Sequence, residues 1–311
     1  MNVSVRNPFG GAAARSRYDA RVAEAKFDMR QLAGKRWPPP PWHLETIGAE
    51  LSGPEPKDRM RSVVARMASQ VAPDFSAVDW DRELAAFAVH KGEDFPAYYR
   101  QPFHSVPGGY LSEAAATGDR GAMEAIYEEA HPRRSLGVRD ALASLVPAEA
   151  RTVVDFGAGT GDGAAAIARR LPGAQVTALE ASPFMIIAGR VQNAGVENLR
   201  FAQGFAERSG LCAESVDAAA ITLVLHECPN AVKREILAEV HRVLRPGGAL
   251  VLSDTPQHDL HDYRGFYEPY KEEWARFDPD ALLRSVGFAS IEACDAAPPL
   301  WTRIARKAAR A

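Results

Sequence analysis

Four glycines alternate with other residues directly after an apolar stretch, where the sequence reads VVDFGAGTGDG from Val153 onward. They are Gly157, Gly159, Gly161 and Gly163. An apolar strand that runs at once into a glycine turn and a helix places a ligand at the carboxyl edge of a sheet, where helix N-terminal amides face it. Glycine is needed there because a Cβ would block the ligand or strain a positive φ angle. The stretch therefore predicts a site that holds a ligand close to the backbone.

Carboxylates around this turn narrow the choice of ligand. Asp155 stands in the strand, and Asp162 stands where a dinucleotide-binding fingerprint has its last glycine. Both acids would repel a pyrophosphate, whereas a nucleoside with a free ammonium group would be attracted. Glu180 ends the next apolar stretch and can bind two ribose hydroxyls, which both kinds of ligand carry. The acids favour a cationic nucleoside, and a nicotinamide-dependent dehydrogenase is the alternative.

His226 and Glu227 are the residues that could move a proton. They follow a long apolar stretch, in the segment LVLHECPN. Because a histidine titrates near neutral pH, His226 could deprotonate a hydroxyl group or orient a carboxylate, and Glu227 could orient the histidine. Adjacent residues on a strand point to opposite faces, so the two can cooperate only if the backbone has turned before His226. The alternative is a histidine that only holds the loop.

The elements that position these residues are short apolar strands that alternate with helices. Ser182 and Asp278 are candidate helix N-caps followed by proline, and Gly287 stands where a helix should stop. This alternation is typical of parallel βαβ units and predicts an α/β fold with a doubly wound, mostly parallel sheet. The expected strands are residues 151–157, 174–181, 198–204, 216–225 and 248–254.

The part of the chain before residue 150 has a different pattern. Its periodic segments are amphipathic and helical, and none has the alternation of a strand. We therefore predict two parts. Residues 1–118 form an N-terminal helical region that acts as a lid, a substrate-binding region or a dimerisation surface, and residues 119–311 form the ligand-binding core.

The core resembles the class I, Rossmann-like S-adenosylmethionine-dependent methyltransferases that act on small molecules. The resemblance rests on three segments in the family's order: VVDFGAGTGDG, LEASPFMI in place of an acid-x-Ser-x-x-Met motif, and VLHECPNAVKREILAEVHRVLRPGGALVLSD. It covers residues from about 119 to 311. The resemblance implies a Rossmann-like core and S-adenosyl-L-methionine as the cofactor.

The resemblance also implies roles in cofactor binding. Asp155 would approach the cofactor's ammonium group, directly or through water, and Glu180 would hold its ribose. The backbone of the glycine turn would line the methionine moiety. The candidate cofactor-binding residues are Asp155, Gly157, Ala158, Gly159, Gly161, Glu180, Ala181, Met185, Gly204, Phe205, Ala206 and Thr222.

The adenine contact departs from the family pattern. Ala181 and Met185 would flank the ring, as in relatives. Phe205 stands where many relatives have an aspartate that accepts from the adenine amino group. Phe205 would then pack on the ring as an apolar wall, and the alternative is an ordinary core phenylalanine.

Two aromatic-rich segments are candidates for binding the methyl acceptor. One precedes the core, where relatives often carry a lid, and the other follows the fifth strand with aromatic residues at helical spacing. In both segments the alternative is packing, as a linker or as core. The candidate substrate-binding residues are Tyr98, Tyr99, His104, Tyr110, Tyr263, Tyr267 and Tyr270, and Trp274 continues the second stripe.

Several functions are disfavoured by composition and motifs. The formal net charge is −3, the three cysteines show no CxxC spacing, and the longest apolar run, residues 218–225, is far shorter than the roughly 20 residues of a membrane helix. The cluster His258, Asp259, His261 and Asp262 has histidines that do not suit magnesium. We therefore expect a cytoplasmic protein with no metal, nucleic-acid or membrane partner, and a homodimer is compatible with the sequence.

These observations predict methylation of a small molecule at a hydroxyl or carboxyl oxygen. The asparagine-proline-proline-aromatic motif that marks amino-group methylation in the family is replaced here by LHEC. Carbon or nitrogen methylation of an aromatic or quinone-like metabolite stays open, as does a cofactor-binding scaffold without activity.

Overall fold

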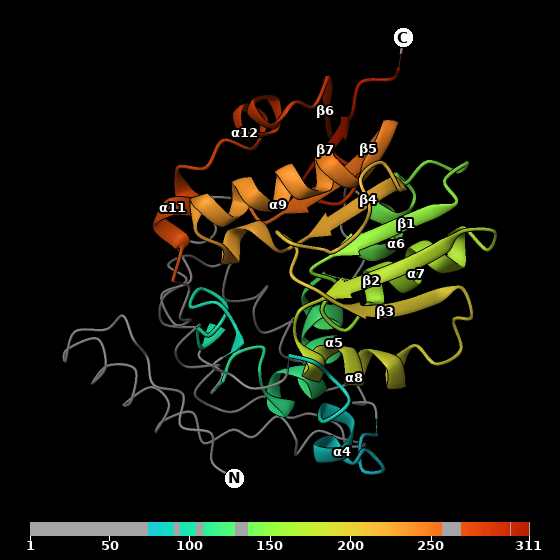
Figure 1. The fold of residues 1–311 in the computed structure, drawn as a ribbon, viewed down its shortest axis with the longest axis vertical. Helices are drawn as coiled ribbons and strands as arrows, with labels where there is room; N and C mark the ends of the chain where they lie inside the picture. Colours follow the sequence, from blue (N-terminus) through green and yellow to red (C-terminus); the bar gives the residue numbers. More distant parts are fainter. Residues whose placement is uncertain are drawn as a thin grey trace, which may run out of the picture. The chain divides into compact units, whose positions relative to one another are not determined.

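The computed structural model describes residues 74–89, 94–103, 108–127, 136–256, 269–298 and 300–310 (Figure 1). The chain packs as two compact units. One contains the sheet, and the described part of the other consists of residues between 74 and 126 together with Ser182–Ala188 and Pro269. Three candidate substrate-binding residues, His104, Tyr263 and Tyr267, lie outside the described residues, as do the helices expected before residue 74 and the cluster around His258.

A seven-stranded mixed sheet forms the first unit, with the strand order β3-β2-β1-β4-β5-β7-β6. The first five strands are parallel, and β7 runs antiparallel to both of its neighbours. This confirms the predicted Rossmann-like, doubly wound, mostly parallel sheet. The strands are β1 (Thr152–Phe156), β2 (Gln175–Glu180), β3 (Leu199–Gln203), β4 (Val216–Thr222), β5 (Leu244–Asp254), β6 (Ser290–Cys294) and β7 (Trp301–Arg306).

The order of the strands reverses between β1 and β4. From β1 the chain moves outward through β2 and β3, and it then returns to the other side of β1 for β4 and β5. In such sheets the loops at the carboxyl ends of the two central strands diverge and leave a crevice in which ligands bind. The segment after β1 contains the glycine turn, and the segment after β4 contains His226. The fold therefore brings the turn and the histidine to the same edge of the sheet.

Helices cover the sheet because their apolar faces match the buried strands. The helices of this unit are α6 (Val138–Ala143), α7 (Asp162–Arg170), α9 (Asn230–Val243), α11 (Lys271–Ala275), α12 (Pro279–Val286) and the 3-10 helix η4 (Leu225–Glu227). Right-handed crossovers place α7 and α9 on opposite faces (Figure 1). Three buried alanines of α7, Ala164, Ala165 and Ala168, are small enough to let that helix lie close to the strands.

The helix ends agree with the predicted capping signals. Asp278 accepts a hydrogen bond from the Ala281 amide at 2.9 Å, and Pro279 opens α12. Gly287 ends that helix with a φ of 113°, a left-handed conformation that glycine adopts without strain. The strand expected over residues 216–225 ends earlier, however, because β4 stops at Thr222 and the non-glycine residue Leu223 has a φ of 58°.

The second unit has a small apolar core of its own. Phe75, Ala115, Ala116, Met185 and Ala188 form a buried cluster. Its described helices are α4 (Trp80–Leu84), most of α5 (Glu113–Tyr127) and the first part of α8 (Pro183–Gln192). Helix α5 runs through residue 118 without a break. The division into two parts that the sequence analysis expects at that residue stays a prediction. Among the described helices of the chain, none has the length and apolar character needed to cross a membrane.

Candidate functional site

The glycine turn, residues 157–161, leads from β1 into α7 and has no room for side chains at two of its glycines. Gly157 and Gly161 have φ angles of 69° and 76°. A Cβ on Gly157 would lie 2.8 Å from Cγ2 of Val224, which belongs to the segment after β4. The turn therefore runs directly beside the segment that carries His226.

The amides of the glycine turn are used by the protein itself. Those of Gly157 and Ala158 donate to the Leu179 carbonyl at 2.9 and 3.1 Å. The Gly159 amide donates to Oε2 of Glu180 at 2.9 Å. The N-terminal helix amides that the sequence analysis expected to face the ligand belong to α7, which begins at Asp162, and that expectation stays a prediction. A pyrophosphate would have to compete for the amides of the glycine turn, which further disfavours a dinucleotide.

Asp155 and Glu180, here called the carboxylate pair, are both nearly inaccessible to solvent, with 4% and 5% of their surface exposed. Burial, and to a smaller extent the charge of Glu180, together raise the pKa of Asp155 to about 7. Gly163 leaves space for Asp155, because a Cβ there would lie 3.1 Å from Oδ2 of the carboxylate. Two buried acids side by side suit a cationic ligand.

Asp162 has a different role from the one that the sequence suggested. Its carboxylate accepts a hydrogen bond from Nδ2 of Asn193 at 3.2 Å and lies 3.4 Å from Nη2 of Arg139. The arginine offsets the negative charge, so Asp162 contributes less repulsion toward a phosphate than expected. The preference for a cation therefore depends on the carboxylate pair.

The remaining candidate cofactor residues lie in the segments that follow β2, β3 and β4. Gly204 donates its amide to the Glu180 carbonyl at 3.0 Å, and Phe205 and Ala206 follow it. Phe205 is partly exposed, with Cζ of Arg208 5.7 Å from its ring centroid, so it is not an ordinary core residue. Thr222 ends β4 and is also partly exposed. Contacts of these residues with adenine stay predictions.

Met185 and Ala181, the residues expected to flank adenine, are both buried. Ala181 accepts a hydrogen bond through its carbonyl from Nε2 of Gln203 at 3.1 Å. Met185 is 2% exposed and packs in the apolar cluster of the second unit with Phe75 and Ala115. Contact of these two residues with the adenine ring likewise stays a prediction.

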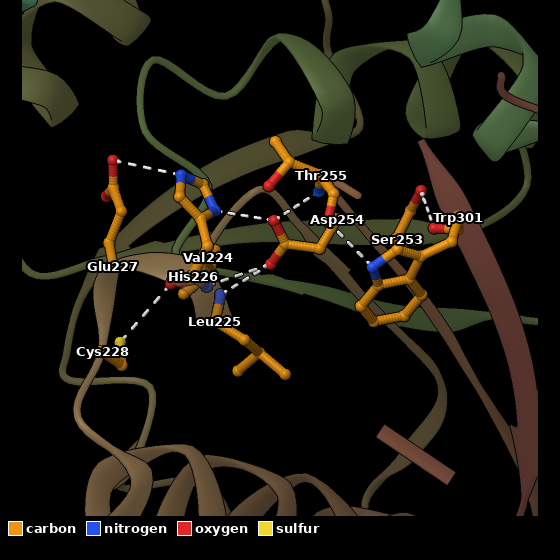
Figure 2. Close-up of polar contacts among 9 residues, drawn as sticks. All are labelled: Val224, Leu225, His226, Glu227, Cys228, Ser253, Asp254, Thr255 and Trp301. Carbon is orange, nitrogen blue, oxygen red and sulfur yellow. Dashed lines mark hydrogen bonds and ion pairs between the residues drawn. The ribbon is translucent and has the colours of Figure 1, made fainter. Parts of the chain in front are cut away.

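His226 lies on η4, after the chain has left β4, and is held between two acids. Its Nδ1 is 2.6 Å from Oδ1 of Asp254, and its Nε2 is 3.6 Å from Oε1 of Glu227. Figure 2 shows the imidazole ring between these two carboxylates. The backbone turn that the sequence required for cooperation between His226 and Glu227 is therefore present.

Asp254 ends β5, is fully buried and organises this centre. Its Oδ2 accepts the amides of Leu225 and His226 at 2.9 and 3.3 Å, and its Oδ1 accepts the Thr255 amide at 2.8 Å (Figure 2). An ionised carboxylate can only accept, so Nδ1 of the histidine carries the hydrogen in this contact, and Nε2 is the ring nitrogen that can take up a further proton. Sequence reasoning missed Asp254, although an acid at the end of the strand next to β4 was the available signal.

An aromatic wall lies behind His226. Trp274 on α11 is fully buried, with its ring centroid 6.0 Å from that of His226 and 5.9 Å from that of Trp301. Of the aromatic stripe expected after β5, Trp274 is thus a core residue. Tyr270 precedes α11 and is partly exposed, and its carbonyl accepts the Trp274 amide at 2.9 Å.

Three candidate substrate-binding tyrosines gather within the second unit. The rings of Tyr98 and Tyr99 are 6.2 Å apart, and those of Tyr99 and Tyr110 are 6.5 Å apart. Phe103 lies 5.3 Å from Tyr110. Contact of these rings with a substrate stays a prediction.

No metal site is found within the part of the chain that the structure describes, where no group of three or more His, Cys, Asp or Glu side chains could hold an ion. Cys212, Cys228 and Cys294 are all free thiols.

Residues 153–248 match the model of a methyltransferase domain family. Trans-aconitate 2-methyltransferase of Deinococcus radiodurans is 34% identical over 139 residues, which cover 44% of this chain and 51% of that protein. Malonyl-(acyl-carrier protein) O-methyltransferase of Laribacter hongkongensis is 36% identical over 164 residues, or 50% of this chain and 52% of that protein. The chain spans about half the length of these curated relatives.

Demethylmenaquinone methyltransferase of Staphylococcus aureus is 29% identical over 138 residues, or 44% of this chain and 53% of that protein. Among solved structures, human N-acetylserotonin methyltransferase in complex with S-adenosylmethionine is 16% identical, with a TM-score of 0.51 over 79% of this chain and 70% of that one. At this identity the likeness concerns the fold alone.

Proposed function

We propose that the core of this chain is a class I, Rossmann-like S-adenosylmethionine-dependent methyltransferase domain and that the protein methylates an oxygen atom of a small molecule. The observation that carries the proposal is the His226–Asp254 pair at the carboxyl ends of β4 and β5, with 2.6 Å between Nδ1 and Oδ1. An O-methyltransferase among the relatives supports the choice of oxygen.

The residues present fit the cofactor. The buried carboxylate pair suits its cationic amino acid end, and Glu180 at the end of β2 can turn toward a ribose. When bound, S-adenosyl-L-methionine supplies an electrophilic methyl group.

His226 acts as the general base in this proposal. Nε2 accepts the proton as the O–H bond of the acceptor breaks, and the oxygen keeps the electron pair with which it attacks. Asp254 keeps Nδ1 protonated, holds the ring in place and stabilises the imidazolium that forms. Glu227, 3.6 Å from Nε2, adds a second negative charge beside that imidazolium.

Two variants test this role. We expect His226→Ala to lower kcat about 10²- to 10⁴-fold, the usual contribution of a general base, with little change in cofactor affinity. Asp254→Asn should lower kcat as well. It should also move the acidic limb of the pH–activity profile to lower pH, because the imidazolium loses its ionic partner. His241, a partly buried histidine whose ring lies 5.1 Å from Phe288, is the matched control, and His241→Ala should leave kcat nearly unchanged.

The acceptor can be found with methyl-labelled cofactor and a metabolite extract, with products identified by mass spectrometry. Label on oxygen of a small molecule supports the proposal. Label on carbon would favour the second candidate, methylation of a quinone-like ring. The similarity to demethylmenaquinone methyltransferase of Staphylococcus aureus supports this candidate. Tight cofactor binding without transfer of label would indicate a scaffold. The expected homodimer, the cytoplasmic location and the lack of a nucleic-acid partner stay predictions.

A further inference from the structure

Ser182 connects two segments that are far apart in the sequence. Its Oγ donates to the Tyr110 carbonyl at 2.6 Å and accepts from the Met185 amide at 3.3 Å. The side chain is fully buried. One hydroxyl thus caps the start of α8 and binds the backbone of a second segment, residues 98–103 and 108–116, here called the tyrosine segment.

Further contacts join the start of α8 to other residues of the second unit. Phe184 stacks on Trp80 with 6.1 Å between ring centroids. Met185 packs with Phe75, Ala115 and Ala116 in the core of the second unit. The first turn of α8 is therefore part of the unit formed by residues from 74 to 126, although the strand before it, β2, belongs to the sheet unit.

The position of Ser182 in the chain gives this contact its consequence. Glu180, one of the carboxylate pair, ends β2 only two residues earlier, and Ala181 lies between them. Oε2 of Glu180 accepts the Gly159 amide of the glycine turn at 2.9 Å. Only Ala181 therefore separates Ser182 from Glu180, the residue that would hold the ribose.

We propose that Ser182 is a positioning residue that couples binding of the cofactor to the order of the tyrosine segment, residues 98–103 and 108–116. This inference rests on the proposed function. Fixing the turn at residues 180–182 favours the state in which the Tyr110 carbonyl is bound, and by linkage a bound Tyr110 raises cofactor affinity equally. Tyr110 lies 6.5 Å from Tyr99, so the coupling extends to the residues predicted to contact the acceptor. Binding of the cofactor then raises the affinity of the acceptor site, and the acceptor raises that of the cofactor equally.

Hydrogen exchange on the full chain tests the coupling without any mutation. Peptides that cover residues 98–103 and 108–116 should exchange about tenfold more slowly with saturating S-adenosyl-L-methionine, and a peptide from β6 should not change. Calorimetry is run in parallel. Binding heat without protection of these peptides would overturn the inference and leave the proposed function intact, whereas the lack of binding heat would overturn both.

Variants identify Ser182 as the connection. Ser182→Ala should weaken cofactor binding about tenfold, the effect of one buried hydrogen bond, and abolish the protection of residues 108–116. Ser182→Thr keeps the hydroxyl and should restore both. Thr117, whose Oγ1 donates to the Glu113 carbonyl at 2.8 Å within α5, provides the control. Thr117→Val should leave cofactor affinity and protection unchanged, and a loss equal to that of Ser182→Ala would contradict the proposed connection.

Discussion

At the scale of single residues, the site combines groups that are unfavourable in isolation. Burial of Asp155 beside Glu180 raises the pKa of Asp155 to about 7, so the free protein holds a proton there over much of the acidic range. Such a proton must leave before the carboxylate can pair with an ammonium group. On this basis we expect the two acids to make the site selective for a cation and to couple its affinity to pH.

The sign of this coupling follows from the raised pKa. Between pH 5.5 and 7.0 the ionised fraction of Asp155 increases, so cofactor binding should tighten about tenfold as the pH rises. The cofactor's own amino group stays protonated in this window. Calorimetry in two buffers of different ionisation enthalpy should detect the release of up to about one proton per site. Asp155→Asn should bind more weakly and with no such pH dependence, and a pH-independent Kd for the wild-type protein would refute the role of Asp155.

At the scale of elements, the segments after β1 and β4 fit one another closely. Leu223, with a φ of 58°, ends β4 by turning the chain, and its amide donates to the Ser253 carbonyl at 3.0 Å. This turn places η4 so that both His226 and the Leu225 amide reach Asp254. A non-glycine residue in this conformation costs of order 1–3 kcal/mol, and its position directly before the proposed base connects the strain with function.

The fit of the two segments can be measured at Gly157. Gly157→Ala combines an unfavourable φ of 69° with a Cβ 2.8 Å from Val224, and we expect it to lower the free energy of unfolding by about 2–3 kcal/mol. Adding Val224→Ala should recover about 1 kcal/mol by removing the clash and leaving the φ strain. Urea unfolding gives both values.

Gly195 is the matched control for this measurement. A Cβ at Gly195 meets nothing within 4 Å, so Gly195→Ala should leave the free energy of unfolding nearly unchanged. Equal stability of Gly157→Ala and Gly195→Ala would show that the two segments do not touch as described.

At the scale of the whole molecule, the sheet was predictable and the details of the site were not. The period of the apolar residues and the caps at Asp278 and Gly287 depend on local rules, which the structure confirms. The partnership of His226 with Asp254 joins residues 28 apart in the sequence, and it depends on where β4 ends. The early end of β4 comes from one strained residue, Leu223, whose apolar character resembles that of the strand before it.

The same contrast holds for the two acids on either side of the glycine turn. A sequence pattern shows where Asp155 and Asp162 stand, but their charges depend on tertiary partners. Arg139 offsets Asp162 from another helix, and Asp155 has a raised pKa because it is buried beside Glu180. The proposed selection of a cation therefore depends on tertiary packing that the sequence pattern does not show.

Calorimetric titration of the full chain with S-adenosyl-L-methionine, compared with titration by NAD at pH 7, tests this selection most directly. We expect saturable heat with a single site for S-adenosyl-L-methionine and no heat for NAD. Heat with NAD, or no heat with S-adenosyl-L-methionine, would contradict the conclusion that the buried carboxylates select a cationic cofactor.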